Sequence, residues 1–244
     1  HDALRTSFIF KNEEWEAKIL KPEDLHVFYT IDLSNEITSN YNSKIEEVLK
    51  DIQENIQLEK GSLFKCIYFE TGNSTNNFII LLAHHMVIDF VSWQIILNYY
   101  TEALLSNKLN TIIKTSSIKT WGEHLLKIAN SKAIKDDLNY WKEQVQNKRK
   151  LPKDFECRLP LFEKDVSLIR LEIEKDVTEN LLNNANEAYS TKIDELLIAA
   201  FAITISNWSN NNEVLLAMER HGRETMHTGI DLSNTSGWFT AFFP

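Results

Sequence analysis

Two adjacent histidines, His84 and His85, close an apolar run over residues 78–83, and Asp89 follows four residues after the second. Histidine is the side chain whose ordinary pKa lies closest to neutral, so it can take and return a proton at working pH. Neighbouring side chains on a strand point to opposite faces, so one ring is expected to face a site and the other the packing. The spacing therefore predicts proton transfer at the end of a strand.

Two other interpretations of the histidine pair stay open. Both rings could be core histidines whose nitrogens are satisfied by hydrogen bonds. The two imidazoles and the Asp89 carboxylate could also bind zinc, although adjacent histidines that diverge chelate a single ion poorly. The aspartate close behind the pair favours a functional site, because perturbed ionisable groups gather at such sites.

A second polar cluster, Glu219-Arg-His-Gly-Arg-Glu224, follows the apolar residues 214–218 directly. A solvated face is the usual explanation of such a charge run. Glu219, however, is expected to be half-buried at the end of the apolar stretch, where an apolar pocket raises the pKa of a carboxyl and makes it a usable acid or base. Arg223 is placed to orient or stabilise an anion.

The remaining motifs exclude several kinds of chemistry. Only six glycines occur and none forms a phosphate loop, which disfavours ATP and dinucleotide chemistry. No Gly-x-Ser-x-Gly elbow is present, and nothing marks Ser92 as a nucleophile.

Residues 231–240 are typical of a loop that re-enters a sheet. The tryptophans at helical spacing are interpreted as core: Trp93, Trp121, Trp141 and Trp208.

The bulk properties narrow the class of protein. The 244 residues suffice for one large domain or two lobes, and a net charge of −9 argues against nucleic acid as a partner. Cys66 and Cys157 form no Cys-x-x-Cys pair, which fits a reducing cytosol. No run is long enough to span a membrane and no signal peptide opens the chain, so a cytoplasmic protein without a membrane partner is expected. Both ends are predicted to be cuts inside a longer polypeptide.

The elements that must position these residues can be outlined from their periodicity. Strands are expected at 4–10, 14–20, 27–33, 64–70 and 77–85, with a helix that Ser43 caps between the third and fourth. Further helices are expected at 91–106, after Ser116 or Ser117, and around 133–145. Later elements are a strand at 166–173, helices at 178–188 and 193–208, and a strand at 213–219. The mixture predicts an α/β or α+β protein with two lobes, 1–150 and 166–244, joined by a linker at 151–165.

Taken together, the polar segments resemble the condensation superfamily of nonribosomal peptide synthetases, and within it the epimerization domains. His84, His85 and Asp89 match the signature His-His-x-x-x-Asp-Gly of the superfamily. Phe90 and Arg220 depart from the family, which usually has glycine at both positions. The more specific similarities are Asp-Phe-Val-Ser-Trp-Gln at 89–94, the cluster at 219–224, Gly-Trp-Phe-Thr at 237–240 with the final proline, and His-Asp-Ala-Leu-Arg at 1–5.

The resemblance implies a fold and an activity. The fold is a two-lobed, chloramphenicol-acetyltransferase-like arrangement, a mixed sheet flanked by helices, with an incomplete second lobe. The activity is the L-to-D epimerization of the Cα of an aminoacyl or peptidyl thioester on the phosphopantetheine arm of a carrier protein, beside neighbouring synthetase domains. No cofactor or metal is expected in the domain itself. The alternatives are peptide-bond formation, which does not require a carboxylate at Glu219, and an inactive docking domain, which Phe90 favours.

Roles for single residues follow from the same resemblance. His85 and Glu219 are expected to be the catalytic proton carriers, with His84 packed behind the site. Asp89 is expected to pair with Arg5 and hold its loop. Arg223 would support Glu219 or the anionic intermediate, and His221 receives no definite role. The candidates for lining the substrate pocket are Phe90, Ser92, Trp93 and Trp238.

Overall fold

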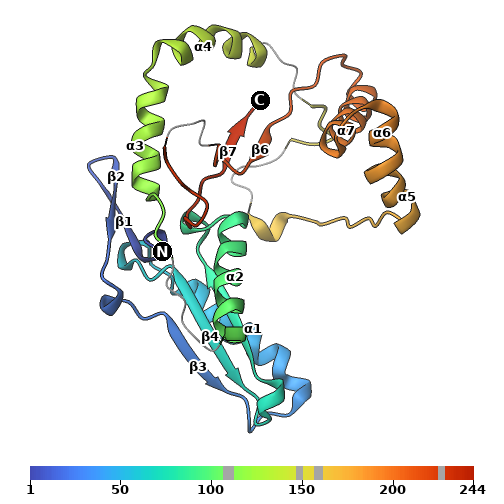
Figure 1. Ribbon diagram of the computed structural model, residues 1–244. Coiled ribbons are helices and arrows are strands. Elements are labelled where there is room, and N and C mark those ends of the chain that lie inside the picture. Colours follow the sequence, from blue (N-terminus) through green and yellow to red (C-terminus); the bar gives the residue numbers. More distant parts are fainter. Residues whose placement is uncertain (107–112, 147–150, 157–161, 225–228) are drawn as a thin grey trace. The chain divides into compact units, whose positions relative to one another are not determined.

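A computed structural model describes residues 1–106, 113–146, 151–156, 162–224 and 229–244 (Figure 1). The chain forms two compact units. The first comprises His1–Asp136 together with Glu219–Phe243, and the second comprises Asp137–Met218 with Pro244. All the candidate residues named above belong to the first unit.

A three-stranded sheet is the framework of the first unit. Its strands are β3 (Phe28–Asp32), β4 (Phe64–Glu70) and β5 (Phe78–Ala83), in the order β3-β4-β5. β3 and β4 are parallel and are joined through helix α1 (Tyr41–Glu54), whereas β4 and β5 are antiparallel. Alternate residues of β4 are buried, and Ile67 and Phe69 pack with Ile52 of α1 in one core cluster. This sheet fixes the position at which β5 ends and the histidines begin.

A hairpin of β1 (Thr6–Lys11) and β2 (Glu14–Ile19) precedes the sheet. Its two turn residues, Asn12 and Glu13, both have positive φ, 51° and 67°, as a two-residue type I′ hairpin turn requires. Short 3₁₀ turns connect the other elements, at Ala3–Arg5, Pro22–Asp24, Thr38–Asn40, Leu58–Lys60, Ser74–Asn76, His85–Val87 and Glu163–Asp165.

Three long helices follow β5 in the chain: α2 (Phe90–Ser106), α3 (Ile118–Ala129) and α4 (Lys132–Val145). The Ser117 hydroxyl accepts a hydrogen bond of 3.0 Å from the amide of Thr120, so Ser117 is the N-cap of α3, as predicted. β6 (Met218–Arg220) and β7 (Ala241–Phe243) form a separate two-stranded sheet. Trp121 of α3 packs with Leu232 and Phe239, which fastens the late segment of the chain to this helix.

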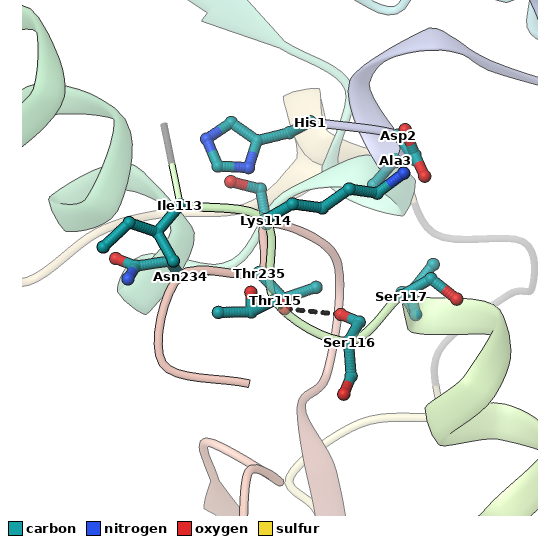
Figure 2. A pocket seen from close by; sticks show the side chains of 12 residues that line it. His1, Asp2, Ala3, Ile113, Lys114, Thr115, Ser116, Ser117, Asn234 and Thr235 are labelled. Carbon is teal, nitrogen blue, oxygen red and sulfur yellow. Dashed lines mark hydrogen bonds between the residues drawn. The ribbon is translucent and has the colours of Figure 1, made fainter. Parts of the chain in front are cut away.

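The residues before α3 also contact the late segment through polar groups (Figure 2). The Thr235 hydroxyl donates to the carbonyl of Ser116 at 2.6 Å and lies 2.7 Å from the Thr115 hydroxyl. Beside these contacts is a hollow of about 260 Å³ that His1 and Lys114 also line. Neither catalytic candidate lines this hollow, so these contacts serve to position residues 231–236.

The second unit contains α5 (Lys175–Asn180), a π-helical turn at Leu181–Ala185, α6 (Asn186–Tyr189) and α7 (Ile193–Ser209). In the first turn of α7 the Glu195 carboxylate accepts a hydrogen bond of 2.8 Å from the amide of the N-cap residue Lys192, which is one half of a capping box. The apolar helix predicted at 193–208 is thus confirmed. The single helix predicted near 178–188 is instead divided by the π-helical turn.

Most of the predicted strands and helices are confirmed, but three expectations are wrong. Residues 166–173 form no strand, because a strand needs a neighbour for its backbone hydrogen bonds and no other described segment pairs with them. Leu168, Ile169 and Leu171 are accordingly at least 80% exposed. The strand at 213–219 is reduced to Met218–Arg220. Ser43 is not an N-cap, because the 3₁₀ turn at Thr38–Asn40 leads directly into α1.

The lobe boundaries stay predictions, and residues 157–161 of the predicted linker, with Cys157, lie outside the described residues. In the part of the chain that the structure describes, no helix is both long and apolar enough to cross a bilayer.

Candidate active site

His84 and His85 follow the end of β5 at Ala83 and lie at the start of a 3₁₀ turn, so strand alternation does not orient them. His84 caps the following 3₁₀ turn, and its Nδ1 accepts a hydrogen bond of 3.2 Å from the amide of Met86. His85 is exposed, and the edge of its ring meets Trp238 at a centroid distance of 5.5 Å and an interplanar angle of 62°. His84 therefore serves the local backbone, and His85 presents its imidazole outward beside an aromatic ring.

His85 opens onto a hollow of about 310 Å³ that two distant parts of the chain share. One wall comes from residues 85–91, at the start of α2, and the other from Glu219, Arg220 and His221 of β6 and its extension. The structure therefore brings both catalytic candidates to one pocket, although more than a hundred residues separate them in the sequence. The full lining is His85, Asp89, Phe90, Val91, Glu219, Arg220, His221 and Thr240.

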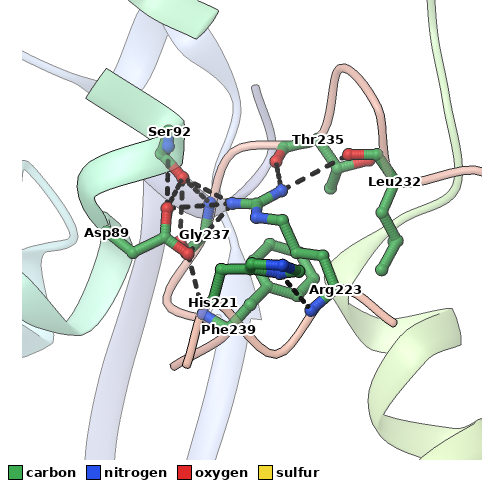
Figure 3. A network of polar contacts seen from close by, with 8 residues as sticks. All are labelled: Asp89, Ser92, His221, Arg223, Leu232, Thr235, Gly237 and Phe239. Carbon is green, nitrogen blue, oxygen red and sulfur yellow. Dashed lines mark hydrogen bonds and ion pairs between the residues drawn. The ribbon is translucent and has the colours of Figure 1, made fainter. Parts of the chain in front are cut away.

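Asp89 holds the two walls together (Figure 3). It precedes the first turn of α2, where its Oδ1 accepts hydrogen bonds of 2.7 Å from the amide and the hydroxyl of Ser92. Arg223 Nη2 lies 2.9 Å and 3.0 Å from the two carboxylate oxygens, and the amide of Phe239 donates to Oδ2 at 3.2 Å. The carboxylate is thus an N-cap, a buried ion-pair partner and an anchor for residues 237–240 at the same time.

The expected pairing of Asp89 with Arg5 is wrong. Arg5 lies in the first 3₁₀ turn, where its Nη2 forms an ion pair of 2.7 Å with Asp2, three residues earlier, and its Nη1 donates to the carbonyl of Leu20. An aspartate within one turn satisfies this guanidinium locally. Arg223 therefore takes the place next to Asp89.

Both terminal nitrogens of Arg223 are held by hydrogen bonds, whereas its buried Nε has no partner among the described residues (Figure 3). Its Nη1 donates to the carbonyls of Leu232 and Thr235 at 3.3 Å and 2.6 Å, and its guanidinium carbon lies 4.0 Å from the centre of the Phe239 ring. Burial lowers the pKa of the Arg223 guanidinium, and the Asp89 carboxylate opposes that shift. The predicted contact of Arg223 with Glu219 is replaced by this network, which makes Arg223 a positioning residue.

Gly222 allows the backbone of residues 221–223 to pass close to Phe239. Its φ is +62°, and a Cβ at this position would lie 1.8 Å from the carbonyl oxygen of Phe239. Only glycine has both the backbone freedom and the missing side chain that this contact demands. Gly222 therefore sets the path of His221 and Arg223 on either side of it.

The candidates for the substrate pocket divide into two groups. Phe90 lines the hollow and is 76% exposed as a residue, and Trp238 contacts His85. Ser92 does not line it, because it is fully buried and its hydroxyl accepts from the Gly237 amide at 3.0 Å. Trp93 faces a different hollow, between α2 and β5, since it lies one helical position on from Ser92.

Glu219 is exposed, and the expectation that it is half-buried is wrong. The preceding apolar residues 214–217 form no regular element, so they build no apolar wall around the carboxylate. Glu219 is thus a candidate proton carrier by its place in the hollow with His85 and not by desolvation.

Comparison with known proteins decides the family. Residues 1–244 match the condensation domain family over their whole length. The chain belongs to the condensation domain family. This condensation domain is 31% identical over 251 residues to a linear gramicidin synthase of Brevibacillus parabrevis and 32% identical over 250 residues to bacitracin synthase 2 of Bacillus licheniformis. It is covered completely in both alignments but spans only 3% and 9% of those relatives.

Solved structures confirm the fold class of this condensation domain. The epimerization domain from the third module of tyrocidine synthetase B aligns with a TM-score of 0.86 at 30% identity, covering 100% of this chain and 56% of that one. The first condensation domain of the calcium-dependent antibiotic synthetase aligns with a TM-score of 0.72 over 100% of this chain and 57% of that one, at 18% identity. The mixed α/β, chloramphenicol-acetyltransferase-like fold is therefore that of condensation domain structures.

Proposed function

We propose that this condensation domain epimerizes the Cα of an aminoacyl or peptidyl thioester carried on the phosphopantetheine arm of a carrier protein. The observation that carries the proposal is the hollow that His85 and Glu219 line together. The similarity to the epimerization domain of tyrocidine synthetase B, at 30% identity and a TM-score of 0.86, supports it further.

The reaction needs a group that removes a proton and a group that returns one. A thioester acidifies the neighbouring Cα–H, yet the bond still requires a positioned base. In our proposal His85 takes the proton from one face of Cα, the C–H electron pair forms the Cα=C bond and the carbonyl π pair moves onto the thioester oxygen. Glu219, which enters the cycle as the protonated acid, then returns a proton to the other face, and exchange with solvent water removes the proton from His85 and restores that of Glu219. The reverse assignment applies when the D-thioester is the substrate. No bond to sulfur breaks and no oxidant or reductant is consumed, so the step is a pure isomerization.

The remaining residues keep these two groups in place. The Asp89–Arg223 ion pair joins the start of α2 to residues 221–223, and it thereby holds the His85 wall against the Glu219 wall. His84 binds the turn behind the site through its Nδ1. In this proposal the domain needs no cofactor of its own. The substrate arrives on the carrier protein of a neighbouring synthetase domain, and the reaction takes place in the cytoplasm.

Peptide-bond formation is the second candidate function, and membership of the condensation family favours it. In that reaction His85 would serve a carrier-bound amine that attacks a carrier-bound thioester, and Glu219 would have no task. A non-catalytic docking domain is the third candidate, for which the exposed Phe90 ring at the hollow is the supporting observation.

The decisive experiment measures deuterium exchange at Cα of an aminoacyl thioester loaded on the carrier protein, in the presence of the intact domain. Epimerization predicts that wild-type protein exchanges the proton in D₂O, and that His85→Ala and Glu219→Gln lose exchange while their folding is retained. Exchange that persists unchanged in Glu219→Gln would remove Glu219 from the scheme. A wild type without exchange would overturn the proposal and favour condensation or docking.

A further inference from the structure

We infer that His221 donates a hydrogen bond from its Nε2–H to the thioester oxygen and so stabilises the enolate formed at that oxygen. The inference rests on the proposed epimerization and assigns a catalytic group to it. His221 lines the same hollow as His85 and Glu219, and its side chain is 54% exposed. It is therefore within reach of a substrate that both proton carriers contact.

The hydrogen bonds of the His221 ring determine which nitrogen carries the proton. Nδ1 accepts a hydrogen bond of 3.1 Å from the backbone amide of Arg223. A nitrogen that accepts cannot hold a proton, so the neutral ring carries its hydrogen on Nε2. Nε2 lies 3.6 Å from Glu224 Oε1, which is within ion-pair distance if the ring is protonated but beyond the range of a hydrogen bond. The N–H is thus defined in its tautomer and can be offered to a ligand.

The backbone that orients the ring is unusually well fixed. The amide that binds Nδ1 belongs to Arg223, whose guanidinium is held by Asp89 and by two carbonyls. Gly222, between the histidine and the arginine, is pressed against Phe239. A donor that needs no reorganisation during the reaction is what stabilises developing charge most effectively.

His85 differs from His221 in this respect. In the described part of the chain, no backbone amide is bonded to the His85 ring, which contacts the Trp238 ring instead. Among the described residues, neither ring nitrogen of His85 is therefore fixed as an acceptor by the backbone. The two imidazoles that line the hollow are suited to different tasks, His85 to proton transfer and His221 to holding the oxygen with a proton that it keeps.

The step balances without any further reactant. His85 accepts the Cα proton, the carbonyl π electrons move to oxygen, and the oxygen accepts the hydrogen bond from His221 without taking its proton. When Cα is reprotonated the carbonyl re-forms and the hydrogen bond weakens. The contact is stronger in the intermediate than in the substrate, so it accelerates turnover more than it aids binding.

A matched pair of variants tests the assignment, because the two amide side chains imitate different nitrogens of the ring. His221→Gln places an N–H near the position of Nε2, whereas His221→Asn keeps an acceptor near Nδ1 for the Arg223 amide but loses the distant donor. We expect His221→Asn to lower kcat for Cα exchange by about 100- to 1000-fold with little change in KM, and His221→Gln to stay within about tenfold of wild type. The substrate is the carrier protein loaded with an aminoacyl thioester, and the enzyme is the intact domain.

The outcomes separate this inference from the proposed function. Wild-type exchange together with full activity of His221→Asn overturns the role of His221 and leaves epimerization standing. Equal losses in both variants also overturn it, since they indicate that the ring only supports the fold. No exchange in the wild type overturns epimerization itself. A second measurement, the ¹⁵N shifts of His221 in the substrate-free domain, should show a protonated Nε2 and an unprotonated Nδ1; the opposite tautomer contradicts the inference even without an activity assay.

Discussion

Replacement of Asp89 by asparagine should destabilise the domain far more than the loss of one surface charge. The side chains of Asp89 and Arg223 are only 4% and 8% exposed. In Asp89→Asn one oxygen can still cap α2, but the amide NH₂ then faces Arg223 Nη2 and the Phe239 amide, which are both donors. The guanidinium is left buried without a counter-charge. Breaking a buried pair from one side costs about 3–5 kcal/mol, which lowers the folded-to-unfolded ratio by a factor of more than about 100.

The Asp2–Arg5 pair provides the matched control. Its two side chains are 25% and 29% exposed, so solvent screens the interaction and Asp2→Asn should cost no more than about 1 kcal/mol. Both variants are compared with wild type by urea titration of the intact domain, followed by tryptophan fluorescence.

Two results would refute the reasoning about Asp89. One is an Asp89→Asn midpoint that equals that of Asp2→Asn, since the buried pair would then contribute nothing special. The other is an Asp89→Asn protein with unchanged stability and unchanged Cα exchange. Adding Arg223→Met to Asp89→Asn removes the orphaned charge, so the double variant should regain part of the lost stability.

Three further predictions concern other parts of the same unit. Gly222→Ala should cost several times more stability than Gly229→Ala, because both positions have positive φ but only the first would clash with Phe239; equal urea midpoints would contradict the close approach. Ser117→Ala should cost about 1 kcal/mol by removing the N-cap of α3, measured in the same titration against Ser167→Ala, an exposed serine outside any helix. Burial raises the pKa of the Cys66 thiol, so the thiolate forms only at higher pH, and alkylation at pH 8 by iodoacetamide should be slower in the folded than in the urea-unfolded protein.

The sequence predicted the elements around the histidines because local patterns determine them. The strand-forming residue types of β4 and β5 and the serine before α3 are properties of neighbouring residues, and the structure agrees with both. The prediction of a strand at 166–173 was wrong because a strand depends on a distant segment as well as on local patterns. Its residue types favour a strand, but a strand also needs a partner, and residue types do not reveal which segment lies alongside.

The residues that line the site were predicted from the sequence, but the contacts between them were not all predicted correctly. The types and spacing of His84, His85 and the cluster at 219–224 identified the two walls of the hollow. The choice between Arg5 and Arg223 as the partner of Asp89 could not be made, because either arginine would satisfy the same chemistry. One signal was available: Asp2, three residues before Arg5, offered that arginine a partner within one turn. The burial of Glu219 was misjudged because hydrophobic neighbours in sequence do not always pack around the residue that follows them.

The Asp89–Arg223 bond also has a consequence for the order in which the protein is assembled during synthesis. The two residues are separated by 134 positions, so the ribosome completes the whole β3-β4-β5 sheet and α2 long before Arg223 emerges. Until then the Asp89 carboxylate can bind only the first turn of its own helix. Contacts of such long sequence separation form late. A nascent chain stopped before residue 223 should therefore carry a folded β3-β4-β5 sheet but lack the Asp89–Arg223 bond that joins the two walls of the hollow.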